Sequence, residues 1–237
     1  MNAFEIAALS MDSDMNRVAN IGQNLANTST PGYKRVVQAQ RPFSAAMLEA
    51  GAPPGVDTGL DMAAGALRAS NNPLDLAVQG DGLFLFDSAD GPVLSRQASL
   101  HVDGQGRLVN DAGQAVQSDR GDLRATPLAG ELRIDAQGEV WQAERSIGRL
   151  RLVRVGDPAR LVPLGGGLYR PSTGDSPQPL DNAQVLSRQR EASNVSSSAE
   201  MVRLMETSRH FEAMAKVVQG YDEAMDKAIR KLGDLGS

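Results

Sequence analysis

The 237-residue sequence contains no cysteine. That absence excludes disulfide bonds, thiolate metal sites and cysteine nucleophiles. No run of about 18 apolar residues is present, so we expect no segment that inserts directly into a membrane. The first residues lack the basic and apolar segments of a secretory signal, and we therefore expect no cleaved signal peptide.

Aromatic residues make up only 4% of the chain, and the net charge of −5 comes without any block of like charges. A nucleic-acid partner requires a concentrated basic surface and gains affinity from aromatic stacking. The composition lacks both features. We therefore predict that no nucleic acid is bound.

Residue patterns typical of catalysis or metal binding are also missing. The two histidines, His101 and His210, are far apart in sequence and suggest no metal set or triad. Gly80 and Gly82 are followed by no Lys-Ser/Thr pair, so they do not indicate a phosphate loop. Asp103 and Asp135 begin Gly-containing segments that favour hairpin turns over calcium loops. We predict no catalytic, cofactor-binding or metal-binding residues, no cofactor and no enzymatic activity.

The C-terminal region, residues 197–232, has the pattern of one long helix without proline. Ser197 and Glu200 form a capping box at its start. Apolar residues recur every seven positions, and a second column follows three positions after each; the first column is Leu204, Phe211, Val218, Met225 and Leu232, and the second is Thr207, Met214, Tyr221 and Ala228. Such a narrow seam is typical of a helix that pairs with another helix.

The first 26 residues have a similar pattern. One column is Phe4, Met11, Val18 and Leu25, and the second is Met1, Ala8, Met15 and Gly22. We interpret the first columns of both ends as an assembly seam that joins the two helices in a coiled-coil stem. The alternative is that both helices pack on the central domain, although that arrangement usually requires a wider apolar face.

Between the two ends the hydrophobic period changes to two. Short apolar segments recur about every ten residues and are separated by turn residues, which indicates an all-β domain built from hairpins. The predicted fold class is α+β: long N- and C-terminal helices form a coiled-coil stem that carries the inserted β domain. The predicted divisions are a helix and turn at 1–35, a connector at 36–75 with a short helix at 43–49, the β domain at 76–188 and the C-terminal helix at 189–237.

Three blocks of residues, at both ends and at the entry to the β domain, resemble the bacterial flagellar basal-body rod and hook protein family. The motif residues are Asn24, Leu25, Ala26, Asn27, Pro31, Gly32, Tyr33, Asn72, Pro73, Leu74, Asp75, Gly80, Gly82, Phe84, Ser193, Asn194 and Val195. Together the blocks are specific, whereas each alone is weak. Tyr33 stands where Phe is common, and Ser196 where Asp or Asn is common.

The resemblance implies a structural subunit of the flagellar rod that polymerises through its terminal helices into the axial drive shaft across the periplasm. It implies other rod subunits and the flagellar type III export apparatus as partners. Residues 148–153 and 211–217 favour a proximal rod protein, with a distal rod protein as the alternative. A wall-cutting hydrolase is less favoured, because no paired carboxylates adjoin an apolar pocket pattern. A non-flagellar coiled-coil adaptor is also less favoured, and a flagellar operon beside the gene would decide against it.

Overall fold

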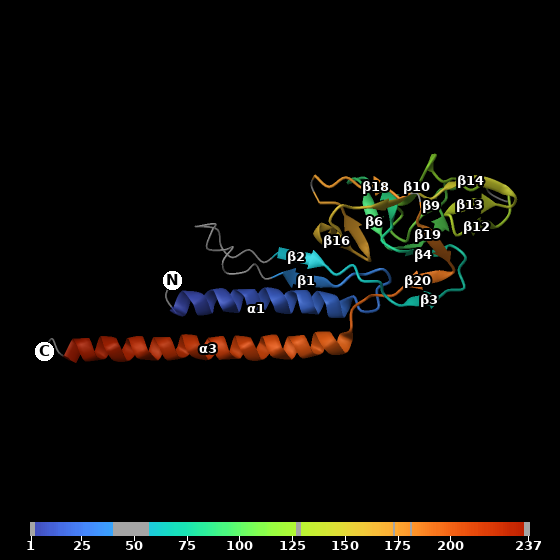
Figure 1. The fold of residues 1–237 in the computed structure, drawn as a ribbon. Helices are drawn as coiled ribbons and strands as arrows, with labels where there is room; N and C mark the ends of the chain where they lie inside the picture. The colour runs from blue at the N-terminus through green and yellow to red at the C-terminus, as the bar shows by residue number, and fades with distance from the viewer. Residues whose placement is uncertain (1–2, 40–56, 127–128, 173, 181, 235–237) are drawn as a thin grey trace. The chain divides into compact units, whose positions relative to one another are not determined.

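The computed structural model describes residues 3–39, 57–126, 129–172, 174–180 and 182–234 (Figure 1). The chain divides into two compact units: residues 1–26, 38–57 and 196–237 form the first, and residues 27–37 and 58–195 form the second. Met1 and the short helix predicted at 43–49 lie outside the described residues. No helix in the described part of the chain is long and apolar enough to cross a membrane.

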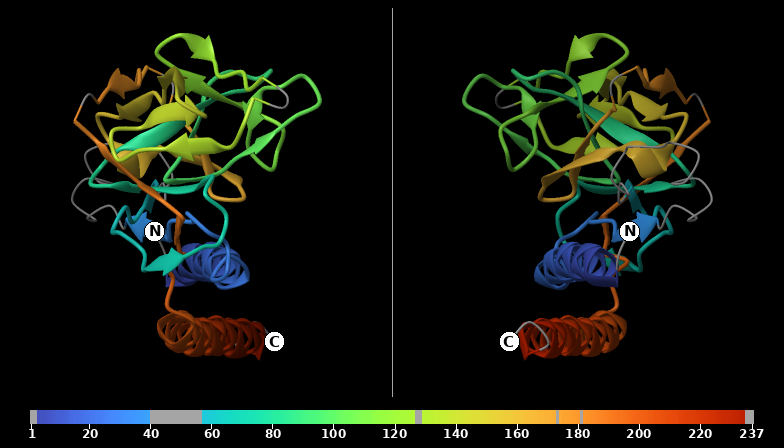
Figure 2. Two further views of the ribbon diagram at one scale, coloured as in Figure 1. Left: turned by 90° about the vertical axis from the view of Figure 1, so that its right-hand side faces the viewer. Right: turned by 90° about the vertical axis from the view of Figure 1, so that its left-hand side faces the viewer.

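The first unit contains helix α1 (Ala3–Ala26) and helix α3 (Ser197–Asp234). Figures 1 and 2 show the two helices side by side. They are antiparallel, because Phe4 near the start of α1 lies beside Tyr221, with ring centroids 6.2 Å apart. At the other end of α1, the Asn24 amide lies 3.5 Å from the Glu200 carboxylate near the start of α3.

The prediction that the long terminal helices form a coiled-coil stem is wrong. The structure has one 24-residue helix at the N-terminal end, one 38-residue helix at the C-terminal end and a large β-rich middle. A coiled coil encloses apolar side chains along its seam. Phe4, Val18 and Met225 of the predicted seam are instead 41%, 39% and 47% exposed.

Polar side chains occupy most of the buried helix positions. Asp14, Asn24, Glu200 and Thr207 are buried there, alongside the apolar Ala7 and Ile21. The second column predicted for the N-terminal helix is displaced by one position, because Ala8, Met15 and Gly22 are exposed. The helices therefore meet through paired polar groups with few apolar side chains between them, which is not the packing of a coiled coil.

The strands are short, and all but parts of β1 and β2 belong to the second unit. Strands β1 to β10 are Val36–Ala39, Asp57–Leu60, Leu67–Ala69, Asp75–Gln79, Leu83–Asp87, Val93–Ser95, Gln97–Ser99, His101–Val102, Leu108–Val109 and Ala115–Ser118. Strands β11 to β20 are Gly121–Asp122, Leu132–Ile134, Glu139–Gln142, Arg145–Arg149, Leu152–Arg154, Val162–Gly165, Leu168–Arg170, Gln178–Pro179, Gln184–Ser187 and Gln189–Glu191, with a short 3-10 helix η1 at Pro158–Arg160.

One large sheet and four small ones organise these strands. The large sheet follows the order β16-β17-β6-β5-β10-β9-β8, with β11 added to β10, β15 to β5 and β18 to β15. The small sheets are β12-β13-β14, β19-β4-β7, β20-β3 and β1-β2. Neighbouring strands are antiparallel both where a short turn joins them, as in β5-β6 and β12-β13, and where they are distant in sequence, as in β19-β4 and β20-β3.

Strand β5 lies between two hydrophobic clusters. Phe84 and Phe86 belong to one cluster, with Leu76, Leu100 and Val140. The alternating residue Leu83 belongs to the other, and Leu85 packs against it. Successive side chains of a strand point to opposite faces. The uninterrupted apolar run at 83–86 is therefore explained by burial of both faces of β5.

Three hairpin turns of the second unit share one hydrogen-bond pattern. Asp103, Asn110 and Asp135 each use a side-chain oxygen to accept the backbone N–H groups two and four residues later, at 2.8–3.1 Å. The backbone N–H of Arg107 is the main cause that lowers the pKa of Asp103. These side chains hold the turns closed, and the segments at Asp103 and Asp135 form turns as predicted.

Candidate functional site

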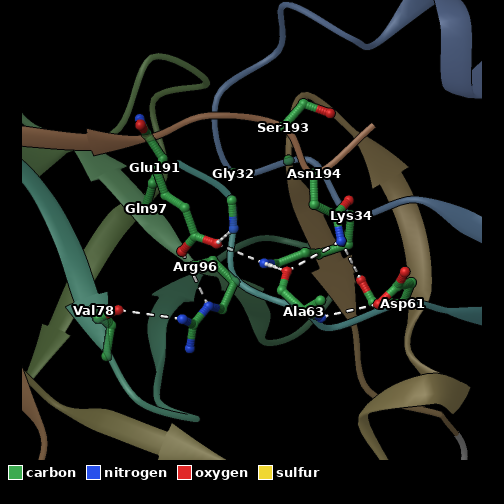
Figure 3. Close-up of polar contacts among 12 residues, drawn as sticks. Gly32, Lys34, Asp61, Ala63, Val78, Arg96, Gln97, Glu191, Ser193 and Asn194 are labelled. Atoms are coloured by element: carbon green, nitrogen blue, oxygen red, sulfur yellow. Dashed lines mark hydrogen bonds and ion pairs between the residues drawn. The ribbon is translucent and has the colours of Figure 1, made fainter. Parts of the chain in front are cut away.

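A cluster of buried charges binds together the two ends of the second unit. One Glu191 carboxylate oxygen accepts the Lys34 ammonium at 2.6 Å and the Gly65 N–H at 2.9 Å. The other accepts the Arg96 Nε at 3.3 Å. In Figure 3 the three charged side chains point toward one another. We call Lys34, Arg96, Tyr169, Glu191 and Asn194 the clasp.

Lys34 is held from three sides and is fully buried. Its Nζ donates to Glu191 and to the Ala63 carbonyl at 2.7 Å, and its backbone N–H donates to the Tyr169 hydroxyl at 2.6 Å. Burial lowers the pKa of the Lys34 ammonium, and its hydrogen bond with Glu191 opposes part of that change. Burial and the hydrogen bond change this pKa in opposite directions, so the Glu191 carboxylate favours the charged form of Lys34 in the interior.

Arg96 connects the clasp to the turn between β4 and β5. Its guanidinium donates to the carbonyls of Gly80, Gly82 and Val78, the last two at 2.7 and 3.2 Å. Gly82 is confined here, because a Cβ at this position would lie 2.8 Å from a Val78 side-chain atom. One arginine therefore binds three backbone carbonyls at this turn, two of them from glycines of the second motif block.

The Tyr169 hydroxyl bridges the segment that follows α1. It accepts the Lys34 N–H and donates to the Gly32 carbonyl at 3.1 Å. Burial raises the pKa of this hydroxyl above its ordinary value. Gly167, just before β17, lets the chain pass close to the segment that follows α1, because a Cβ at this position would lie 2.5 Å from the Pro31 carbonyl oxygen.

Asn194 ties the segment that precedes α3 to the same region. Its side-chain oxygen accepts the Arg35 N–H at 2.8 Å, and its amide donates to the carbonyls of Asp61 and Ala63 at 2.7 and 3.1 Å. The Gly32 N–H donates to the Glu191 carbonyl at 2.8 Å. The residues leaving α1 and those approaching α3 are therefore joined by side-chain and backbone bonds.

Asp75 performs a similar role at the start of β4. Its carboxylate accepts the hydroxyls of Ser70, at 2.5 Å, and Ser99, and the Asn72 amide at 3.3 Å. Arg190 on β20 lies 3.6 Å away. This single buried carboxylate thus connects the turn before β4 with strands β7 and β20.

Polar side chains connect the two helices of the first unit. The buried Asp14 carboxylate lies 2.6 Å from Nδ1 of the exposed His210, and Arg17 lies 3.6 Å from the same carboxylate. Glu200 accepts the Asn24 amide and forms an ion pair with Arg203 at 2.5 Å. Each carboxylate buried between the helices therefore has a cationic or hydrogen-bonding partner.

The structure places the predicted residues as follows. Of the proposed seam, Met11, Leu25, Leu204, Phe211 and Val218 are half-buried, Phe4, Val18 and Met225 are exposed, and the Leu232 side chain lies outside the description. Of the motif residues, Asn24, Gly32, Tyr33, Asp75, Gly82, Phe84 and Val195 are buried, Leu25, Asn27, Pro31, Leu74, Ser193 and Asn194 are half-buried, and Ala26, Asn72, Pro73 and Gly80 are exposed.

The three motif blocks meet in the second unit, where Gly32, Gly80 and Gly82 bind members of the clasp and Asn194 is itself one of them. Sequence reasoning missed the charged and aromatic members that bind them. One signal was available: Lys34 is the only lysine before residue 216. A single lysine among many arginines indicates that this position has a specific role. The sequence does not show which residue pairs with it.

Comparisons with known proteins place the chain in a family. Residues 188–231 match the family described as flagellar basal body rod FlgEFG protein C-terminal. The flagellar basal-body rod protein FlgF of Caulobacter vibrioides is 30% identical over 223 residues, which cover 91% of each chain. The chain belongs to the flagellar basal-body rod protein family.

Within this family the chain is similar to FlgF proteins. FlgF of Escherichia coli is 30% identical over 241 residues, which cover 92% of this chain and 93% of that protein. FlgG of Agrobacterium fabrum is 28% identical over 260 residues, with 94% and 96% covered. The resemblance to a rod protein is confirmed, and the FlgG alternative has no better support.

Proposed function

We propose that this chain is a structural subunit of the flagellar basal-body rod and that it enters the rod through its terminal helices. Family membership across nine-tenths of the chain supports the first part. The second part is supported by the placement of exposed apolar side chains. Among the described residues, five of these lie on α1 and six on α3, while the rest of the chain has four.

The outward apolar side chains suit contacts with neighbouring subunits. They are Phe4, Ile6, Leu9, Met15 and Val18 on α1, and Met201, Val202, Met205, Val217, Met225 and Ile229 on α3. Large exposed apolar surfaces on soluble chains are typical of interaction sites. The assembly residues that we propose are Phe4, Met11, Val18, Leu25, Leu204, Phe211, Val218, Met225 and Leu232. In this proposal they contact adjoining subunits.

The clasp gives the subunit a way to bear load. Any force that enters along α1 passes into residues 27–35, and any force along α3 passes into residues 191–195. Glu191 and Asn194 bind these two segments to each other through short hydrogen bonds. Because removal of one partner of a buried ion pair costs about 3–5 kcal/mol, the junction resists separation of the two ends.

The finer parts of the proposal concern export and location. The chain travels through the flagellar type III export apparatus and becomes part of the rod that spans the periplasm. Its partners are other rod subunits of the same and neighbouring kinds. It acts by assembly and not by catalysis, which an assay of peptidoglycan cleavage by the purified chain would test directly.

The main experiment is isolation of basal bodies from cells that carry or lack the gene. We expect the chain to copurify with basal bodies, and we expect its deletion to stop rod completion and swimming until the gene is restored. A deletion strain that builds intact rods and swims normally would contradict the function. A proximal position predicts that deletion blocks the rod near its base, whereas a distal position predicts a partly built rod.

A further inference from the structure

All of the sulfur in this chain belongs to methionine. The sequence has nine methionines and no cysteine. Within the described residues, Met62 is the only methionine of the second unit, and the others lie on the helices: Met11 and Met15 on α1, and Met201, Met205, Met214 and Met225 on α3. The thioether is a soft, polarisable group that oxidants convert to a sulfoxide. The helices therefore carry most of the groups that such oxidation attacks in the described chain.

Met201 and Met205 form an exposed pair near the start of α3. They are 51% and 54% exposed, and Val202 beside them is 49% exposed. Residues four positions apart share one face of a helix. This face differs from that of Glu200, which is 1% exposed and bonded to Asn24 of α1. The two thioethers are therefore open to solvent together, within one apolar patch.

Met62 and Met214 provide a contrast within the same chain. Met62 is half-buried and packs against the hydrophobic cluster that contains Leu83. Met214 is half-buried on the part of α3 that lies along α1. Oxidation of a sulfur-containing side chain depends on its exposure to the oxidant. We therefore expect Met201 and Met205 to react before these two methionines.

The reaction requires hydrogen peroxide as the oxidant and no protein group besides the thioether. The sulfur attacks one peroxide oxygen, the O–O bond breaks and an S–O bond forms. The sulfur gives up an electron pair and is oxidised, and the peroxide is reduced. The proton on the transferred oxygen passes to the leaving hydroxide, which departs as water. The product is methionine sulfoxide, a polar group that methionine sulfoxide reductases return to the thioether.

A sulfoxide changes what this surface can contact. Its oxygen loses hydration when it enters an apolar contact, which is unfavourable without a hydrogen-bond donor. We propose that Met201 and Met205 are oxidation sites and that their conversion to sulfoxide by hydrogen peroxide prevents a free subunit from entering the rod. The proposal rests on the assembly role of α3 given above. It adds a chemical control to that role, because oxidised subunits are left out until they are reduced.

Peptide mapping of the purified chain tests the first part. The full chain is treated with a limiting amount of hydrogen peroxide, digested with trypsin and measured by mass spectrometry. Cleavage after Arg203 separates Met201 from Met205, so each sulfoxide is measured by itself. We expect both residues to gain oxygen several-fold faster than Met62 and Met214. Equal or slower oxidation of Met201 and Met205 would overturn the assignment of these sites.

Competition between two chains in one cell tests the second part. The parent chain is expressed together with a variant that carries Met201→Leu and Met205→Leu, because leucine is apolar and resists this oxidation. The ratio of the two chains is measured in basal bodies built after a pulse of hydrogen peroxide. Oxidation of other components affects both chains equally. We expect the leucine variant to be enriched several-fold after the pulse and not before it, whereas Met62→Leu, the matched control, should not be enriched.

A permanent polar substitution supplies a second measurement. Met201→Gln with Met205→Gln should enter basal bodies several-fold less than the parent without any oxidant. A leucine-to-parent ratio that peroxide leaves unchanged, or full incorporation of the glutamine variant, would overturn the proposal. The competition uses the parent chain, so a folding defect of the glutamine variant would leave that test valid. Absence of the untreated parent chain from basal bodies would instead count against the rod function.

Discussion

The Lys34 ammonium and the Glu191 carboxylate lie 2.6 Å apart, although 157 positions separate them in the chain. Both side chains are almost completely buried, at 0% and 1% exposure. The pair joins the segment that leaves α1 to the segment that approaches α3. This ion pair therefore closes a loop that contains most of the second unit, and its removal has consequences that can be measured.

Glu191→Gln should destabilise the second unit by about 3–5 kcal/mol, because Lys34 and Arg96 would keep their charges in the interior without a carboxylate. The single tryptophan, Trp141 on β13, reports unfolding in denaturant by its fluorescence. Glu144→Gln removes an exposed carboxylate and serves as the matched control. Equal unfolding midpoints for the two variants would show that the clasp adds nothing to stability.

Tyr169→Phe should cost about 1–3 kcal/mol at neutral pH, because the Lys34 N–H and the Gly32 carbonyl lose their shared hydroxyl. It should also change the response to alkali. The pKa of Tyr169 is raised in the folded state, so above about pH 10 the folded chain keeps a proton that the unfolded chain releases. The free energy of unfolding of the parent chain therefore falls as pH rises above 10.

The Tyr169→Phe variant should lack that part of the alkaline loss. Lys34, whose pKa is lowered by burial, has the opposite effect, because its unfolded form holds the extra proton up to about pH 10.5. Lys34 is present in both chains, so their difference isolates the tyrosine. Tyr221→Phe on α3 is the control, and a parallel pH dependence for all three chains would refute the assignment.

Gly65→Ala should be strongly destabilising. A Cβ at this position would lie 1.9 Å from the Ala192 carbonyl oxygen, so the paired segments around β3 and β20 would have to separate. Overpacking of this kind costs about 1–3 kcal/mol or more. Gly104→Ala, where the added Cβ meets nothing within 4 Å, should change stability little. Calorimetry compares the two, and a matched melting temperature would mean that the backbone yields easily at Gly65.

His210→Ala should loosen the helices without unfolding the second unit. The buried Asp14 would retain only Arg17, at 3.6 Å, as a charged partner in the described structure. Loss of a partner leaves a buried carboxylate undercompensated, and we expect a loss of about 1–3 kcal/mol in helix pairing. Faster amide exchange across α1, with unchanged Trp141 fluorescence, is the expected result. Glu206→Ala on the same helix is the control, and equally slow α1 exchange in both variants would argue against the contact.

Phe211→Asp should prevent incorporation into the rod and stop swimming while the second unit remains folded. Phe211 is a half-buried residue of the proposed assembly surface. A carboxylate at an apolar contact must lose its hydration or prevent the contact. Glu212→Asp, on the exposed neighbouring position, should swim normally. Normal swimming of the Phe211 variant would remove this residue from the assembly surface.

The sequence predicted the local features well. Helix α3 was expected over 197–232 and spans Ser197–Asp234. This prediction succeeded because helix capping and the seven-residue apolar repeat depend on residues that are close together in the chain. The hairpin turns at Asp103 and Asp135 were also recognised, since each is held by its own side chain. Strand β5 stood out as a continuous apolar run because both its faces are buried.

The sequence failed where distant polar groups decide the packing. On α1 the buried residues Ala7, Asp14 and Ile21 form the inward column. Because an aspartate stands in its middle, this column has the sequence pattern of a solvent-exposed face. His210, which accounts for the burial of Asp14, is 196 positions away. The clasp was missed for the same reason, because the pairing of Lys34 with Glu191 follows from tertiary structure and has no period.

Strand β5 has a final consequence for how the body of the subunit fails. Its alternate side chains form part of the wall of both hydrophobic clusters. Loss of the strand would open both interiors together, so we expect the two clusters to unfold in a single transition. We expect a subunit built in this way to resist partial unfolding under load, which suits a component of a rod.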